Sequence, residues 1–370
     1  MSGLLLKNVS KIYPGGQQAI KDFTLEIKER EFLILSGPAG CGKSTLLRMI
    51  AGLEEISTGS LYIDGKDMTD ADPKERNIAM VFKNSVLYPN MSVSDNLSFA
   101  LRMGKVIQGE IERRIDETAE FLNLKGILEK MPEELTKEET YRVLLGRALM
   151  RRPGILLLDS TIADLEESLQ AVLRKEFLNV YKRMDMTVIY ATENQETAMT
   201  LGTRMVILDD GAISQEDTPK NLAEHPANRF VAGVVGQPPM NFFTVSVFGE
   251  NNRVGIKGKS GRMFLPERQG KALAEGGYFG KEVILGIRGD ALHIAEEKKK
   301  GEDGVFAVKF QGMDSCGGRP AARFQVEDSE GLCLTGEEIL SCGVGDELKL
   351  SADGEKVYLF DKDTEKTIVN

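Results

Sequence analysis

The sequence predicts an α/β domain with a mostly parallel sheet, followed by a smaller all-β domain with a barrel-like fold. Up to about residue 236, apolar β-branched segments alternate with amphipathic segments, as in strands joined by crossover helices. After that point, short strand-like segments are separated by glycine-rich turns. Gln237, Pro238 and Pro239 punctuate the chain between the two patterns. We therefore expect one domain over residues 1–236 and a second over residues 237–370.

The elements of the first domain follow from the period of its apolar residues. Apolar runs predict strands at Leu4–Val9, Thr24–Ile27, Phe32–Leu35, Ile78–Phe82, Ile155–Leu158, Thr187–Ala191 and Arg204–Leu208. Amphipathic spacing predicts helices at Ser44–Ala51, Glu110–Leu122, Glu138–Met150, Glu166–Met184 and Gln195–Leu201. Because the pattern between Asn84 and Arg147 is almost wholly helical, we expect an inserted helical subdomain over about residues 84–150.

The second domain is predicted to consist mainly of short strands. These are expected at Thr244–Phe248, Glu282–Ile287, Val305–Phe310, Ala322–Val326, Glu347–Leu350 and Lys356–Phe360. The charged run Glu296–Asp303 is interpreted as a solvated loop.

Composition narrows the class of function. The chain has 370 residues and a net charge of −10, which argues against a broad nucleic-acid-binding surface. The start, Met1–Lys7, is too short in apolar residues to predict a signal peptide, and Ile155–Leu158 is far below the roughly 20 residues that span a bilayer. Any role at a membrane is therefore expected to need a partner. The four cysteines are Cys41, Cys316, Cys333 and Cys342. They show no CxxC pair and no metal-site spacing, as expected for reduced cytosolic thiols.

The strongest motif has the pattern GxxxxGK[ST] and lies between a predicted strand and a predicted helix. Its residues are Gly37, Pro38, Ala39, Gly40, Cys41, Gly42, Lys43 and Ser44, with Thr45 next on the helix. In this context the glycines let backbone N–H groups surround phosphate oxygens, and the helix N-terminus favours an anion. Lys43 is expected to reach the β- and γ-phosphates of ATP, and the Ser44 hydroxyl to bind Mg²⁺. A chance glycine turn is the alternative.

Asp159 is the predicted second ligand of Mg²⁺. It ends the apolar strand Ile155–Leu158, where a carboxylate can complete the magnesium site beside a phosphate-binding loop. The alternative is an aspartate that caps the following helix.

Seven segments connect the sequence to a known family: Gly37–Glu55, Ile78–Phe82, Leu87–Pro89, Leu145–Leu149, Pro238–Phe243 and, more weakly, Leu285–Arg288 with Leu359–Asp361. They resemble the ATPases of ABC importers for multiple sugars and glycerol phosphate. The resemblance implies a P-loop nucleotide-binding domain with a helical subdomain and a C-terminal regulatory domain of oligonucleotide-binding (OB)-like fold. It also implies a homodimer or heterodimer that holds two ATP molecules beneath permease subunits, at the cytoplasmic face of the cell membrane. Gly289 and Asp290 depart from the family's usual Pro-Glu.

Two further roles depend on this resemblance. Tyr13 stands where the family stacks an aromatic ring on adenine, although a half-buried tyrosine at a strand end is the simpler interpretation. Leu87–Leu101 corresponds to the family's surface for a cytoplasmic helix of the permease. The apolar residues of this stretch fit a buried core equally well; they are Leu87, Tyr88, Met91, Val93 and Leu97.

The positions that carry catalysis in the family are replaced here. Ser160 stands where the family has a glutamate that polarises the attacking water, and loss of a general base typically costs about 10²–10⁴-fold in rate. Glu193 replaces a histidine and brings negative charge towards the γ-phosphate, where a neutral or positive donor is wanted. Lys83 replaces a glutamine whose carbonyl can bind a cation, which an ammonium group cannot do.

The family's signature loop, Leu-Ser-Gly-Gly-Gln, reads Leu135–Glu139 in this chain. The two glycines that allow close backbone approach are lost. We interpret Thr136 and Glu139 as a capping box that starts the next helix. We also expect Lys83 and Glu193 to pair with each other; the alternative is that Glu193 serves as a relocated base.

The sequence thus predicts an ATP-binding importer subunit with impaired hydrolysis. A fully active ATPase with compensating substitutions and a nucleotide-binding regulator outside transport are the alternatives. The transported solute is not encoded in these motifs.

Overall fold

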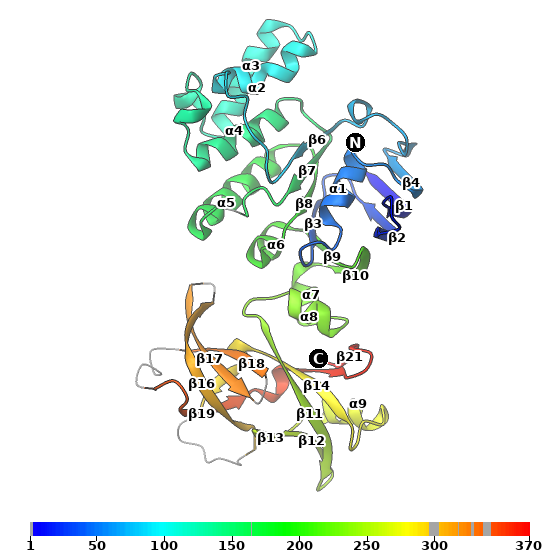
Figure 1. The fold of residues 1–370 in the computed structure, drawn as a ribbon, viewed down its shortest axis with the longest axis vertical. Coiled ribbons are helices and arrows are strands. Elements are labelled where there is room, and N and C mark those ends of the chain that lie inside the picture. The colour runs from blue at the N-terminus through cyan, green and yellow to red at the C-terminus, as the bar shows by residue number, and fades with distance from the viewer. Residues whose placement is uncertain (1–2, 164, 296–302, 317, 327–328, 336–341) are drawn as a thin grey trace. The chain divides into compact units, whose positions relative to one another are not determined.

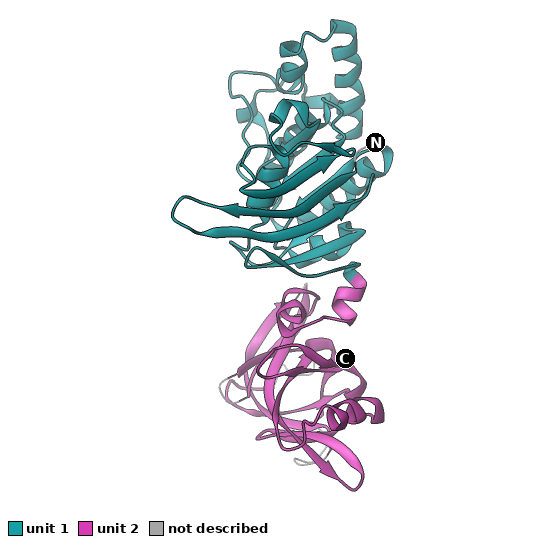
Figure 2. Cartoon of the chain, turned by 90° about the vertical axis from the view of Figure 1, so that its right-hand side faces the viewer, with its two compact units in different colours: residues 1–219 teal, residues 220–370 magenta. Residues whose placement is uncertain are grey.

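The computed structural model describes residues 3–163, 165–295, 303–316, 318–326, 329–335 and 342–370. Within the described residues the chain forms two compact units, residues 1–219 and 220–370 (Figure 2). The predicted domain boundary, after residue 236, lies within the second of these units. The domain limits therefore stay a prediction. Most of the predicted charged loop, residues 296–302, lies outside the described residues.

The first unit contains a six-stranded sheet in the order β10-β9-β3-β8-β7-β6. Its strands are β3 (Phe32–Ser36), β6 (Ile78–Val81), β7 (Ile155–Asp159), β8 (Thr187–Ala191), β9 (Arg204–Asp209) and β10 (Ala212–Asp217). The neighbouring strands β9, β3, β8, β7 and β6 pair in parallel, and β10 is antiparallel to β9. Every residue of β3, β7 and β8 is buried, which explains their continuous apolar sequences.

A second, antiparallel sheet of the same unit has the order β2-β1-β4-β5. Its strands are β1 (Leu4–Ile12), β2 (Gln18–Ile27), β4 (Thr58–Ile63) and β5 (Lys66–Asp67). Helix α1 (Lys43–Ala51) buries Leu46, Leu47 and Ile50 in a core shared with side chains of both sheets, such as Leu6 and Ile189. The strands β4 and β5 of this sheet, and β10 of the six-stranded sheet, were not among the sequence predictions.

The remaining helices of the first unit include the expected helical stretch (Figure 1). They are α2 (Val93–Met103), α3 (Gln108–Phe121), α4 (Lys137–Leu149), α5 (Glu167–Arg183) and α6 (Gln195–Leu201), with short 3₁₀ turns at Pro73–Glu75, Lys125–Ile127 and Pro132–Glu134. In sequence, the cluster α2–α4 is inserted between β6 and β7 of the sheet. Among the described residues, every helix is too short or too polar to span a lipid bilayer.

The apolar residues of the stretch 87–101 divide between the two interpretations. Leu87, Val93 and Leu97 are buried in the helical cluster, so for them the core interpretation is confirmed. Tyr88 is 42% exposed and presents apolar surface, as does Val86 just before the stretch, which is 76% exposed.

The second unit is rich in strands, as predicted. Its elements are α7 (Pro219–Glu224, which begins at the end of the first unit), α8 (Arg229–Val234), β11 (Met240–Glu250), β12 (Arg253–Gly258), β13 (Gly261–Phe264), α9 (Glu267–Glu275), β14 (Glu282–Arg288), β15 (Leu292–Ile294), β16 (Val305–Cys316), β17 (Arg319–Val326), β18 (Ser329–Leu334), β19 (Glu347–Ala352), β20 (Val357–Asp361) and β21 (Thr367–Val369), with 3₁₀ turns at Gly289–Ala291 and Gly354–Lys356. The strand order is β15-β19-β16-β13-β12-β11-β14-β20-β21, and β17 and β18 extend from β16.

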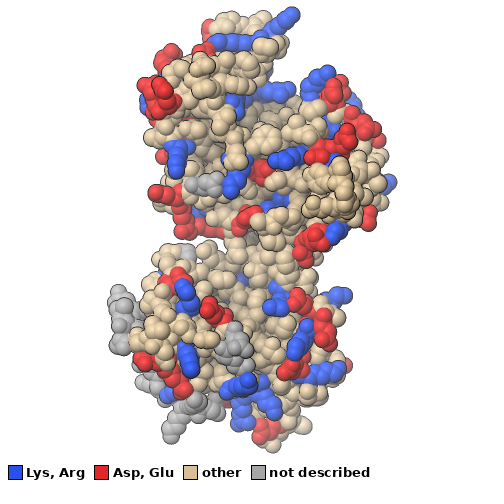
Figure 3. Space-filling view, viewed as in Figure 1, with Lys and Arg blue, Asp and Glu red and all other residues tan. Residues whose placement is uncertain are grey.

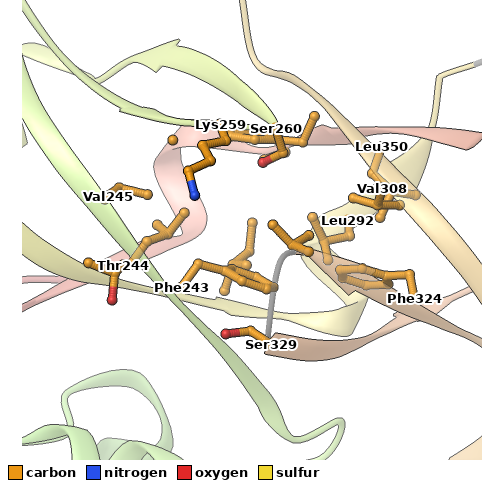
Figure 4. Close-up of a pocket in the computed structure, with 16 residues that line it drawn as sticks. Phe243, Thr244, Val245, Lys259, Ser260, Leu292, Val308, Phe324, Ser329 and Leu350 are labelled. Atoms are coloured by element: carbon orange, nitrogen blue, oxygen red, sulfur yellow. The ribbon is translucent and has the colours of Figure 1, made fainter.

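A cavity of about 230 Å³ opens in the core of the second unit. The rings of Phe243, Phe306 and Phe324 line it together with aliphatic side chains. Figure 4 shows Lys259 and Ser260 on one side of this space, with Phe243 and Phe324 across from them.

Asn241 connects three segments of the second unit and is 6% exposed. Its amide donates to the carbonyls of Ile287 (3.0 Å) and Leu332 (2.9 Å), and its side-chain oxygen accepts from the Leu332 N–H at 2.7 Å. We expect Asn241→Leu to lower the free energy of unfolding by about 2 kcal/mol, because three backbone groups lose buried partners. Urea denaturation of this variant checks the expectation. Lys257→Leu, at an exposed position on β12, is the control and should change stability by less than about 0.5 kcal/mol.

Candidate functional site

The glycine-rich loop between β3 and α1 has a backbone that only glycine tolerates at several points. Gly37, Gly40 and Gly42 have φ values of 146°, 79° and 107°. A Cβ atom on Gly37 would lie 2.4 Å from the Leu208 carbonyl oxygen. A Cβ atom on Gly42 would lie 2.7 Å from the Ala19 carbonyl oxygen. Glycine is therefore required both for the turn and for the close approach of neighbouring backbones.

The loop is fixed by two neighbouring segments. Gly211, in the turn between β9 and β10, donates from its N–H to the Cys41 carbonyl at 3.1 Å. Its own carbonyl accepts from the Lys21 N–H on β2 at 2.9 Å. The hairpin strand β2 and the β9–β10 turn thus hold the loop from outside the motif.

Lys43 is the charged centre of the loop and is only 5% exposed. Its ammonium donates to the carbonyls of Gly37 and Pro38, each at 2.8 Å. It also forms an ion pair with Glu193, with 3.4 Å between Nζ and Oε1. The buried thiol of Cys41 lies 3.6 Å from the same ammonium, and burial raises the pKa of that thiol.

Ser44 and Asp159, the two predicted magnesium ligands, lie within hydrogen-bond distance of each other. The Ser44 hydroxyl donates to Asp159 Oδ1 at 2.9 Å, and Asp159 is buried at the end of β7. Both groups offer oxygen, which Mg²⁺ prefers. Across the described residues, three or more His, Cys, Asp or Glu side chains nowhere gather into a metal-binding cluster. A magnesium ion held by Ser44 and Asp159 would therefore complete its shell with phosphate and water oxygens.

The residues of the loop suit a nucleotide phosphate. Pro38, Ala39 and Gly40 are exposed at the tip, whereas Ser44 and Thr45 are half-buried on the first turn of α1. Helix α1 has no side-chain cap at its N-terminus. Its first N–H groups thus lack a side-chain partner at the end of the helix that attracts anions.

Ser160, at the position of the missing base, follows Asp159 with a φ of 48°. Its N–H donates to the Ala191 carbonyl at 2.9 Å, and its hydroxyl lies 3.4 Å from the same oxygen. The residue is thus turned towards the end of β8. A hydroxyl in this setting has no proton-accepting pKa near neutral pH that would serve general-base catalysis.

Glu193 lies on a short segment with a fixed backbone. The Thr192 N–H donates to the Leu35 carbonyl at 3.0 Å, and Asn194 caps α6 by accepting from the Thr197 N–H at 2.7 Å. The partner that the structure gives Glu193 is Lys43, and not the expected Lys83. Lys83 is exposed just after β6.

The parallel sheet explains why these side chains meet. Lys43, Asp159 and Glu193 all follow the carboxyl ends of adjacent strands β3, β7 and β8, which share one edge of the sheet. Motif spacing predicted the first two positions. The contact between Lys43 and Glu193 joins residues 150 positions apart and has no local sequence signal.

The capping box predicted at Thr136 is confirmed. The Glu139 N–H donates to Thr136 Oγ1 at 3.1 Å, and the Thr136 N–H donates to Glu139 Oε2 at 2.8 Å. Lys130 lies 3.3 Å from Glu139. Glu138 pairs with Arg142, which also forms two bonds to Glu176 on α5. Three carboxylates in this region therefore have partners within the same unit.

The Glu139 contact predicts a pH effect. The backbone N–H of Thr136, with help from Lys130, holds the pKa of Glu139 below its usual value. Because the folded pKa is lowered, the stabilisation is complete above the unfolded value of about 4.3 and is lost as the pH falls through the folded pKa. We expect Glu139→Ala to destabilise the protein at pH 7, and the difference from the parent to shrink below about pH 4. Urea denaturation at pH 7 and pH 3.5 measures this; a difference that is equal at both pH values would contradict it.

Tyr13 lies in the turn after β1, within a small polar cluster that sequence reasoning missed. Its hydroxyl lies 3.4 Å from Glu54 Oε2, and the Lys11 ammonium is 5.2 Å from the centre of its ring. Lys11 and Glu54 form an ion pair at 2.6 Å. The ring is half-buried, so the structure supports a fixed tyrosine and leaves its stacking on adenine as a prediction. Lys11 and Tyr13 are two residues apart, a spacing that places side chains on one face of an extended segment. This spacing was the sequence signal for the cluster.

Comparison with known proteins now identifies both parts of the chain. The family model described as "ABC transporter" matches residues 20–163, and the model "MalK OB fold domain" matches residues 236–292. These matches confirm the predicted P-loop fold and the OB-like fold of the C-terminal part.

Relatives match over their full length. The oligosaccharides import ATP-binding protein MsmX of Bacillus subtilis is 38% identical over 371 residues, which cover 100% of both chains. The trehalose/maltose import ATP-binding protein MalK of Thermococcus litoralis is 38% identical over 379 residues, again with 100% of both chains covered. A solved dimer of the ATP-binding cassette MJ0796 with ADP and Pi has a TM-score of 0.52 and 29% identity, and the match covers 58% of this chain and 98% of that chain.

Proposed function

This chain belongs to the family of ABC transporter ATP-binding proteins, and on that premise we propose that it is the ATP-binding subunit of an importer for oligosaccharides or related solutes. Two full-length relatives named for the import of oligosaccharides and of trehalose/maltose support this class of solute. Its place is at the cytoplasmic face of the cell membrane, on permease subunits. The dimeric cassette MJ0796 supports a homodimer or a heterodimer with a homologous subunit.

The nucleotide site of this proposal uses the glycine-rich loop and the end of β7. Backbone N–H groups of residues 37–45 and the Lys43 ammonium would hold the phosphates of ATP. Ser44 and Asp159 would hold Mg²⁺, which when bound neutralises phosphate charge. Tyr13 is proposed as the residue beneath adenine.

A permease surface is proposed around Tyr88. Tyr88 and Val86 are exposed, and Arg147 holds both: its guanidinium donates to the Val86 carbonyl at 3.0 Å and lies 5.2 Å from the centre of the Tyr88 ring. An exposed apolar pair that is fixed in place suits an apolar helix of a partner. On the face shown in Figure 3, acidic and basic side chains are interspersed, which does not favour nucleic acid as the partner.

Hydrolysis is proposed to be impaired, and one observation carries this part: Glu193, at the position of the family's histidine, forms its ion pair with the P-loop lysine Lys43. A carboxylate paired with that ammonium is a poor candidate for a relocated base, since the ion pair directs its oxygen to the lysine. Ser160 offers no replacement base. The site therefore has the groups that bind a nucleotide but lacks the groups that activate water.

The test is a paired measurement on the purified full-length chain. Calorimetric titration with Mg·ATP should show binding, while steady-state phosphate release should be at least about 10²-fold below that of an intact relative such as MsmX assayed in parallel. Lys43→Ala is the control, and it should abolish binding. Turnover equal to that of the relative would refute impaired hydrolysis, and a folded chain that binds no adenine nucleotide would refute the proposed nucleotide site.

A further inference from the structure

We infer that the nucleotide site favours a nucleoside diphosphate over the corresponding triphosphate, because Glu193 competes with the γ-phosphate for Lys43. This inference rests on the proposed function, in that it names the ligand preferred by the proposed nucleotide site. The specificity-determining residue is Glu193.

The hydrogen-bond capacity of Lys43 is the first argument. An ammonium group has three N–H donors and no acceptor. Two are directed to the carbonyls of Gly37 and Pro38, and Glu193 Oε1 at 3.4 Å and the Cys41 thiol at 3.6 Å are the acceptors for the remaining one. A lysine at this place in the motif reaches both the β- and the γ-phosphate. A triphosphate thus needs more hydrogen bonds from the Lys43 ammonium than a diphosphate does. It must compete for them with the Glu193 carboxylate, which is already bound to Lys43.

Local charge is the second argument. The carboxylate that pairs with the Lys43 ammonium belongs to Glu193, and Asp159 lies nearby through its hydrogen bond with Ser44. The next acidic group along the segment, Glu196, is neutralised by Arg174 at 2.7 Å. A γ-phosphate would add negative charge where one lysine already faces a carboxylate, and like charges at this range repel. A diphosphate ends one phosphate earlier and leaves the Lys43–Glu193 pair in place.

The fixed backbone around Glu193 is the third argument. Thr192 is bonded to Leu35, and Asn194 caps α6, so the Cα atom of Glu193 cannot withdraw from the loop without breaking these bonds. The side chain itself is 56% exposed and can rotate towards solvent. Triphosphate binding is therefore weakened and not abolished.

The experiment measures the dissociation constants of Mg·ADP and Mg·ATP for the full-length chain by calorimetric titration. The parent should bind ADP more tightly than ATP. In Glu193→Gln, a side chain of the same size without charge, the ratio Kd(ATP)/Kd(ADP) should fall by about tenfold, which corresponds to about 1.4 kcal/mol. Glu196→Gln is the matched control from the same segment, and its ratio should stay within about twofold of the parent.

The outcomes separate this inference from the proposed function. A parent that binds ATP more tightly than ADP, or a ratio that Glu193→Gln leaves unchanged, overturns the inference and leaves the nucleotide site intact. A folded parent that binds neither nucleotide overturns both. Thermal unfolding of each variant verifies folding, and Glu193→Ala provides a second removal of the charge if Glu193→Gln proves unstable.

Discussion

Replacing Ser160 by glutamate and Glu193 by histidine in the same chain is expected to raise ATP turnover by about 10²-fold or more. The first change supplies a carboxylate next to Asp159 that can accept a proton from water, a role that typically contributes about 10²–10⁴-fold. The second removes the carboxylate that occupies Lys43 and provides a neutral donor for developing phosphate charge. Phosphate release at saturating Mg·ATP measures the gain.

The controls for this double variant follow from the site. Adding Lys43→Ala should return turnover to the background. Each single change should gain much less than the pair, because groups that act on one reaction centre are not additive. Ser160 has a φ of 48°, a backbone strain that any residue with a Cβ atom bears, so a glutamate there adds little further strain. Turnover that stays at the parent level despite tight ATP binding would contradict the assignment of the defect to these two positions.

Arg76→Ala is expected to cost about 3–5 kcal/mol of stability in the first unit. Arg76 is 4% exposed, and burial lowers the pKa of its guanidinium. It donates to four backbone carbonyls: Met49 at 2.8 Å, Ile50 at 3.0 Å, Ala71 at 3.0 Å and Thr69 at 3.1 Å. The first two belong to the last turn of α1; the Met49 carbonyl also accepts from the Gly52 N–H at 3.1 Å, and Arg76 supplies further donors at this helix end. Alanine would leave buried acceptors without donors and open a cavity beside the helix end.

Urea denaturation followed by helical circular dichroism measures this effect in the full-length chain. The transition should be compared between variants and not treated as two-state, since the chain has two units. Arg76→Lys should recover part of the loss, because one ammonium replaces a planar fork of donors. Arg48→Ala is the matched control: Arg48 is exposed on α1, and its loss should change stability by less than about 0.5 kcal/mol. A loss at Arg76 no larger than this control would contradict the capping role.

The sequence was sufficient for features that depend on local patterns. The glycine-rich loop, the strand before Asp159 and the capping box of Thr136 each combine a short motif with the period of its neighbours, and the structure contains all three. The parallel sheet followed from the same alternation. Strand β10 was missed because its half-exposed residues, Ala212–Asp217, lack a continuous apolar run.

Features that depend on distant contacts could not be predicted. The partner of Glu193 is set by which loops meet at the edge of the sheet, and the opposite charges from which we predicted Lys83 do not determine that. Arg76 gave no signal, since nothing in a loop sequence says that a guanidinium will reach the end of a helix 26 residues earlier. The apolar residues of 87–101 divide between core and surface according to helix packing, which the period within one short helix does not determine.

The contacts of Gly211 bear on how a nucleotide enters. Because the turn after β9 and strand β2 already clamp the loop, its shape is set when the protein folds and not when the ligand arrives. Association should then lose little chain entropy at residues 37–42, and the on-rate should not be limited by a slow rearrangement. Gly211→Ala would loosen this clamp, since its Cβ atom would meet the Ala19 oxygen at 2.5 Å, and the resulting protein would have to order the loop each time it captures a ligand.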